Sequence, residues 1–186
     1  MSHFGNGTEY GLHCLIILAQ APGTIISSRD LADLQGVSVS FLAKIFPKLE
    51  KAGIVTAAEG IRGGYGLARP ASEVTVLDVV EAIEGRKPLF DCQEIRGRCA
   101  VFGGQPPAWA TAGVCGIHAV MIRAERTLRD ELARTTLHDL ADGVARKAPP
   151  EFEADVKTWL ADRIEVRTEA RIAAVRKAGP RRRKEI

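Results

Sequence analysis

Two helix signals joined by a glycine turn, and followed at once by a glycine-rich hairpin signal, constrain this 186-residue chain more than any other feature. Ser27 and Asp30 have the spacing of a capping box, so a helix is expected to begin there and to end at Gly36. A second helix is expected over residues 39–52, with Ser38 at its start. A short helix, a tight turn and a second helix with a polar outer face predict a helix-turn-helix.

The residues after the second helix predict a β-hairpin. Residues 54–56 and 65–68 have the composition of two short strands, and the glycine-rich residues 59–64 lie between them as a turn. A hairpin directly after a helix-turn-helix is the wing of a winged-helix fold. We therefore predict a mainly α fold, with a winged helix-turn-helix DNA-binding domain over residues 1–88.

In such a fold, the outer face of the second helix and the wing are the surfaces that contact DNA. The residues predicted to contact DNA are polar, basic or part of the wing: Ser38, Ser40, Lys44, Lys48, Arg62, Gly63, Gly64 and Tyr65. Arg62, at the wing tip, suits the negative potential of a minor groove. The alternative for the four helix residues is an ordinary solvated face.

The second half of the chain predicts a long helix that needs a partner surface. Residues 91–114 have no periodicity, whereas residues 116–134 predict a helix about 28 Å long. Its apolar stripe consists of Ile117, Met121, Ala124, Leu128 and Leu132. A lone winged helix has little surface to cover such a stripe, which favours a dimer interface over packing onto its own domain. The predicted divisions are a cysteine loop (89–115), a dimerisation helix with a short helix after it (116–148), and a charged C-terminal helix with a basic tail (149–186).

The C-terminal region carries regularly spaced arginines. Arg163, Arg167 and Arg171 repeat every fourth residue, and the basic residues 181–184 follow. This pattern predicts either added contacts to DNA phosphates or a solvated helix and tail.

Composition and motifs argue against several other classes of protein. Apolar residues make up 46% of the chain and charged residues 26%, as in soluble globular proteins. Polar residues, glycine and proline interrupt the uncharged stretches 10–28 and 99–122, so neither predicts a membrane span. No lysine or arginine precedes Arg29, so the basic start of a signal peptide is missing. The sequence has no phosphate-binding loop, dinucleotide fingerprint or nucleophile elbow. We expect a cytoplasmic protein that is not an enzyme and does not bind a membrane.

Three of the four cysteines cluster around the unpatterned loop. The spacing is Cys92-x6-Cys99-x15-Cys115-x2-His118. Cys115 and His118 share one face at the start of a helix, whose N-terminus favours a thiolate. Three thiolates and an imidazole suit either a structural zinc ion or an iron–sulfur cluster, and free thiols are a third possibility. Cys14 lies among apolar residues and is predicted to be an ordinary core residue.

The order of these features resembles the Rrf2-type bacterial transcription regulators over about residues 8–142. The residues that carry the resemblance lie in six segments: 28–32, 41–45, 51–55, 63–65, 67–69 and 79–85. The resemblance implies a homodimer that binds a pseudo-palindromic operator on double-stranded DNA through two winged helices. It also implies a regulator, expected to be a repressor, that senses iron–sulfur cluster status, iron, nitric oxide or redox state.

The same resemblance implies a cofactor and its ligands. A 2Fe-2S or 4Fe-4S cluster would be held by Cys92, Cys99 and Cys115, with His118 as the fourth ligand or Glu9 as the alternative. Pro47 departs from the expected pattern and should kink or end the recognition helix. The alternative functions are a regulator of the same fold that uses zinc or free thiols, and an iron–sulfur carrier or electron-transfer protein without a DNA target.

Overall fold

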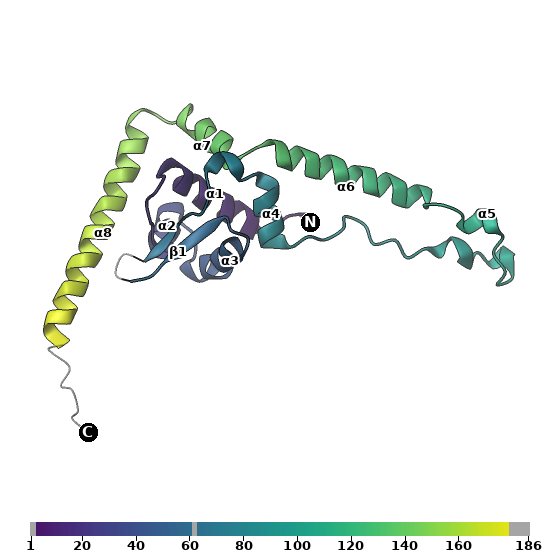
Figure 1. Ribbon diagram of the computed structural model, residues 1–186, viewed down its shortest axis with the longest axis horizontal. Coiled ribbons are helices and arrows are strands. Elements are labelled where there is room, and N and C mark those ends of the chain that lie inside the picture. Colours follow the sequence, from purple (N-terminus) through teal and green to yellow (C-terminus); the bar gives the residue numbers. More distant parts are fainter. Residues whose placement is uncertain (1–2, 61–62, 179–186) are drawn as a thin grey trace, which may run out of the picture.

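In the computed structural model of this protein, one long helix extends away from a small helical body and a second long helix runs along the other side of that body (Figure 1). One is α6 (Gly116–Arg134), which carries the cysteine loop at its far end, and the other is α8 (Glu151–Ala178). The structure describes residues 3–60 and 63–178. None of the helices in these two ranges has both the length and the apolar character that a membrane span requires.

The body has the order of elements of a winged helix, which confirms the predicted mainly α fold. Its elements are α1 (Asn6–Gln20), α2 (Ser28–Gln35), α3 (Val39–Lys51), β1 (Val55–Ala58), β2 (Gly64–Leu67), α4 (Val76–Glu84) and α7 (Leu137–Ala145). A 3-10 turn, η1 (Ala71–Glu73), precedes α4, and three short elements form the cysteine loop: η2 (Ile95–Arg98), η3 (Ala100–Phe102) and α5 (Ala108–Thr111).

The apolar stripe of α3 forms the centre of the core. Leu42, Phe46 and Leu49 are fully buried there, against Leu15 and Leu18 of α1. This packing leaves the opposite face of α3 exposed to solvent.

α1 and α3 each run as one continuous helix. α1 packs closely on α4 at Gly11, where a β-carbon would lie 2.5 Å from a methyl carbon of Ile83. α3 does not end at Pro47 but continues to Lys51. Ala43 and Pro47 are both exposed, so the carbonyl that loses its partner at proline can bind water.

The wing is attached to the start of α2 by backbone hydrogen bonds. β1 and β2 are antiparallel, with Val55 opposite Leu67. Ile26 and Tyr65 exchange both backbone bonds, at 3.0 and 2.8 Å between nitrogen and oxygen. A β-carbon on Gly64 would lie 2.3 Å from the Ile26 carbonyl oxygen, so only glycine allows this approach. The wing is therefore held at a set position beside α2.

Glu84 joins the end of α4 to the start of α1 and predicts a pH-dependent stability. Its carboxylate accepts hydrogen bonds from Thr8 Oγ1 at 2.8 Å and from the Gly5 amide at 2.9 Å. The Thr8 hydrogen bond, more than any other contact, lowers the pKa of Glu84 below its ordinary value of about 4.5. A lowered pKa contributes stability above the unfolded value, and that stability is lost as the pH falls through the folded value.

Glu84→Gln should therefore lower the free energy of unfolding by about 1 kcal/mol at pH 7. The difference from the unsubstituted protein should shrink as the pH is lowered below about 4. Urea midpoints at several pH values measure this difference. A Glu84→Gln deficit of the same size at pH 7 and at pH 3 would contradict it.

Candidate nucleic-acid interface and cysteine loop

The amino-terminal end of α3 presents small polar and basic side chains to solvent. Ser38, Ser40 and Lys44 are exposed, and the Oγ atoms of the two serines lie 2.8 Å apart. Ser38 is the residue before the helix, as predicted, but its hydroxyl makes no capping bond to the first turn within the described structure. The amides at this helix end are electropositive and suit a phosphate oxygen.

Lys48, one turn further along α3, is used inside the domain. Its Nζ donates to the Ile83 carbonyl oxygen at 2.7 Å, which satisfies a free acceptor at the end of α4. Lys44, in contrast, has no hydrogen bond or ion pair with any residue that the structure describes. Of the two lysines predicted to face DNA, the geometry leaves only Lys44 free to do so.

The predicted wing contacts have structural roles in the hairpin. A β-carbon on Gly63 would lie 2.8 Å from the Ala58 carbonyl oxygen, and Gly64 approaches Ile26 as described above. The ring of Tyr65 packs on Phe46, with 4.5 Å between ring centroids. These three residues position the wing. Arg62, the predicted minor-groove contact, lies outside the described residues.

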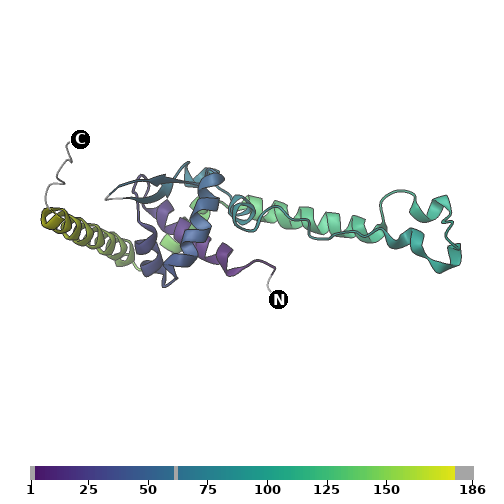
Figure 2. The ribbon, with the colours of Figure 1, turned by 90° about the horizontal axis from the view of Figure 1, so that it is seen from below.

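The cysteine loop lies at the end of α6 that is distant from the body (Figures 1 and 2). Cys92 lies on the extended segment that leaves α4, and Cys115 immediately precedes α6. Both line one pocket of about 330 Å³, together with the apolar residues Phe90, Ile95 and Ile117. The structure thus brings together two of the three predicted cysteine ligands.

The rest of the predicted ligand set does not join them. Cys99 is exposed between η2 and η3 and does not line the pocket, and the His118 ring faces Phe90 at 6.2 Å between centroids. Within residues 3–60 and 63–178, no three ligand-type side chains converge closely enough to hold a metal ion. Glu9 lies on α1 in the body, at the other end of α6 from the loop, so only a partner chain could bring it there.

Arg96 connects the two sides of the cysteine loop, a role that the sequence did not reveal. Its guanidinium donates to the carbonyl oxygens of Thr111, Ala112 and Gly113, at 3.2, 3.2 and 2.9 Å. It also forms a two-bond ion pair with Glu94, at 2.6 and 2.8 Å. Glu94 has a left-handed backbone, with a φ of 45°. The hydrogen bonds and the charge of Glu94 raise the pKa of Arg96. Arg96 lines the same pocket as Cys92 and Cys115.

Cys14 should differ sharply from the three loop cysteines in reactivity. Its side chain is fully buried, and burial raises the pKa of its thiol to about 12. In reduced, metal-free protein, a disulfide reagent should titrate three thiols without unfolding, and the fourth only in denaturant. The Cys14→Ala variant should show the same three accessible thiols. Four thiols that react together in the native protein would contradict this assignment.

Comparison with known proteins identifies the family. Residues 4–143 match the Rrf2 family, described as "Iron-dependent Transcriptional regulator". Two proteins from strains of Mycobacterium tuberculosis, MT1325 and Rv1287, are named as HTH-type transcriptional regulators. Each is 32% identical to this chain over 136 residues, which is 73% of this chain and 78% of the relative.

Solved structures share the fold. CymR (YrzC), the global cysteine regulator of B. subtilis, has a TM-score of 0.60 at 24% identity, over 76% of this chain and 98% of its own. T. potens IscR has a TM-score of 0.58 at 22% identity, over 81% and 95%. The oxidised form of Staphylococcus aureus CymR has a TM-score of 0.54 at 28% identity, over 75% and 96%. With its winged helix, its long α6 and a family match that covers most of the chain, this protein belongs to the Rrf2 family of transcriptional regulators.

Proposed function

We propose that this protein is a cytoplasmic DNA-binding repressor that acts as a homodimer on a pseudo-palindromic operator and responds to a cysteine-ligated iron–sulfur cluster. The observation that carries the DNA-binding part is the division of α3 into two faces. Leu42, Phe46 and Leu49 are buried, while Ser38, Ser40 and Lys44 stay exposed beside a wing of set position.

The two classes of contact have different roles in this proposal. The amides at the start of α3 and the Lys44 ammonium bind phosphates and set the register on the duplex. Ser40 then lies where a recognition helix contacts base edges in the major groove. The wing backbone and Arg62 contact the adjacent minor groove.

The exposed length of α6 supports a homodimer. Every residue of α6, all of which the structure describes, is at least partly exposed. Ile117 and Val120, which lie on the same side of α6, have 64% and 51% of their surface exposed. A second copy of α6 would cover such a surface, and a two-fold axis would present two copies of α3 to two half-sites.

The chemistry of the loop supports a cluster. Cys92, Cys99 and Cys115 supply soft sulfur donors of the kind that bind iron–sulfur clusters, with His118 or the partner's carboxylate as the fourth donor. A bound cluster would supply a group whose charge and integrity change with iron, oxidants and nitric oxide. The chain itself would link the cluster to the position of α6. Cys92 follows α4 and Cys115 begins α6, so ligation of both would restrain α6 relative to the DNA-binding body.

A second candidate is a same-fold regulator that uses zinc or the thiols themselves. It is supported by the exposed position of Cys99 apart from the pocket shared by Cys92 and Cys115. The fold likeness to a cysteine regulator, CymR, is compatible with it.

DNA binding is tested with a duplex selected by the full chain from a random-sequence library. We expect a consensus sequence with two-fold symmetry. The affinity should fall steeply as the salt concentration rises, because binding releases counterions from the DNA phosphates. A scrambled duplex of equal composition serves as the control. Equal affinity for the selected and scrambled duplexes would refute the proposal.

The cluster is tested by anaerobic purification followed by iron, sulfide and zinc analysis. We expect iron and sulfide in equal amounts, lost in Cys115→Ala and retained in Cys14→Ala, which changes a cysteine away from the loop. Zinc without sulfide would favour the second candidate. Iron and sulfide that persist in Cys115→Ala would overturn the ligand assignment.

A further inference from the structure

The first half of α8 is part of the body, although the family match ends at residue 143, before α8 begins. Leu160 is buried in the core cluster, and Val156 and Trp159 pack against it. The guanidinium of Arg163 lies over the Trp159 ring, 5.0 Å from its centroid. These contacts fix α8 along one side of the winged helix.

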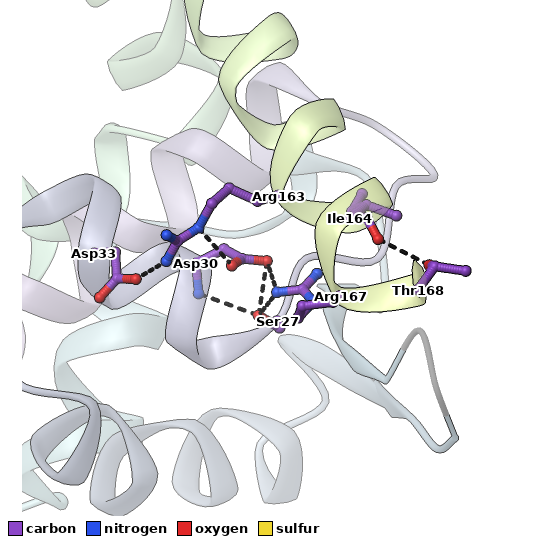
Figure 3. Close-up of polar contacts among 7 residues, drawn as sticks. All are labelled: Ser27, Asp30, Asp33, Arg163, Ile164, Arg167 and Thr168. Carbon is purple, nitrogen blue, oxygen red and sulfur yellow. Dashed lines mark hydrogen bonds and ion pairs between the residues drawn. The ribbon is translucent and has the colours of Figure 1, made fainter. Parts of the chain in front are cut away.

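Ion pairs with α2 set the register of α8 (Figure 3). Asp30 of α2 is only 1% exposed and pairs with both Arg163 and Arg167. Arg167 also donates to Ser27 Oγ at 2.6 Å, and Arg163 pairs with Asp33. The expected phosphate contacts or solvated face were therefore wrong for these two arginines, because one turn of α8 directs both at α2. A carboxylate as buried as Asp30 requires such partners.

The docking site lies where α2 meets the wing. Ser27, which Arg167 contacts, follows Ile26, whose backbone pairs with Tyr65 of β2. From this point α8 runs past the β1–β2 hairpin, and its end projects beyond the side of the body on which α3 lies (Figures 1 and 2). The carboxyl-terminal end of α8 therefore lies on the side of the body that faces DNA in the proposed function.

The charge of the chain changes sign along α8. Residues 151–170 contain six acidic and three basic residues, and Arg163 and Arg167 are two of those three. Residues 171–186 contain seven basic residues and one acidic residue, and residues 179–186 lie outside the described part of the chain. A positive segment that begins on the DNA side of the body is complementary to duplex phosphates.

We propose that residues 171–186 are a second DNA-contacting arm, held in place by α8, that binds phosphates flanking the segment contacted by α3 and the wing. This inference rests on the proposed function. Because the arm binds phosphates and not base edges, it adds affinity and footprint length without changing the preferred sequence.

The main test is a chain that ends at Ala170, which keeps every α8 residue whose contact with the body the structure describes. With the selected duplex, we expect the same consensus, a footprint shortened at both ends and an affinity at least ten-fold lower. Each lost phosphate contact makes the salt slope shallower by about 0.9. If each protomer loses two contacts, the dimer loses four, and the slope should become shallower by about 3.6. A full-length chain with Arg181, Arg182, Arg183 and Lys184 changed to glutamine should show part of the same loss.

A second pair of variants tests whether α8 positions the arm. Arg163→Ala/Arg167→Ala removes the pairing with Asp30 and keeps the basic arm, so the flanking protection should disappear. Lys157→Ala, on the same helix, removes only an exposed pair with Glu153 and should bind like the unsubstituted chain. Melting temperatures report whether each variant is folded.

The outcomes separate the two proposals. If the full chain does not prefer its selected duplex to the scrambled one, the proposed function fails. If the full chain is selective but the chain ending at Ala170 has the same affinity, salt slope and footprint, only the arm is refuted. A contact of residues 171–186 with an acidic protein would produce that second result.

Discussion

Gly64→Ala is expected to cause one of the largest losses of stability of any single-methyl change in this protein. The added carbon would lie 2.3 Å from the carbonyl oxygen and 2.5 Å from the carbonyl carbon of Ile26, and 2.7 Å from the Ser27 nitrogen. All three are backbone atoms, so no side-chain rotation relieves the clash. Overpacking of this kind costs about 1–3 kcal/mol, and here it also separates β2 from the start of α2.

DNA binding should fall together with stability, because Ile26 and Tyr65 hold the wing beside α2. The matched control is Gly143→Ala, inside α7, where the nearest atom within 4 Å is the end of the flexible Arg146 side chain. Alanine in a helix interior should stabilise by about 0.5–1 kcal/mol. Urea unfolding and affinity for the selected duplex measure both effects. A Gly64→Ala protein as stable as the unsubstituted one would show that the wing is not seated as described.

Lys44→Ala and Lys48→Ala should have opposite phenotypes, although the residues lie one turn apart on α3. Lys44 is exposed and without a partner in the described structure, so its loss should leave the unfolding free energy unchanged and weaken DNA binding about ten-fold or more. The salt slope should become shallower by about two, since a dimer would lose one phosphate contact in each half-site.

Lys48→Ala should instead lower stability by about 1 kcal/mol, because the Ile83 carbonyl oxygen loses its donor. Its salt slope should stay that of the unsubstituted protein. Unfolding curves and salt titrations on the same selected duplex separate the two variants. A shallower slope in Lys48→Ala, with normal stability, would mean that its ammonium leaves Ile83 and binds phosphate.

Signals confined to one or two helical turns predicted most of the body. The capping-box spacing of Ser27 and Asp30 and the stop at Gly36 predicted α2, and the structure has α2 over Ser28–Gln35, with Ser27 as its side-chain cap and Gly36 in the left-handed region. Periodicity placed α6 at the residues observed, Gly116–Arg134. Cys14, predicted as a core residue, is fully buried. In each case the deciding interactions lie within the element or next to it.

The sequence was a poorer guide to the roles of individual polar side chains. Lys48, Arg163 and Arg167 are ordinary charged residues on exposed-looking helix faces, and Arg96 has no local signal. Their partners come from distant parts of the chain: Ile83 is 35 residues from Lys48, and Asp30 is 137 residues from Arg167. Gly63 and Gly64 were predicted to contact DNA, yet their need for glycine comes from backbone approaches within the fold.

The sequence by itself determined the helices, the hairpin, the apolar stripe of α3 and the cysteines that could serve as ligands. Helix caps, hydrophobic periodicity and glycine act over a few residues, so their effects can be predicted from the local sequence. Only the tertiary structure decided which charges face solvent and which pair inside, where the cysteine loop stands relative to the body, and that α8 docks on α2. Those outcomes depend on which segments meet after the chain has folded, and a buried carboxylate such as Asp30 selects its cations from whatever elements pack against it.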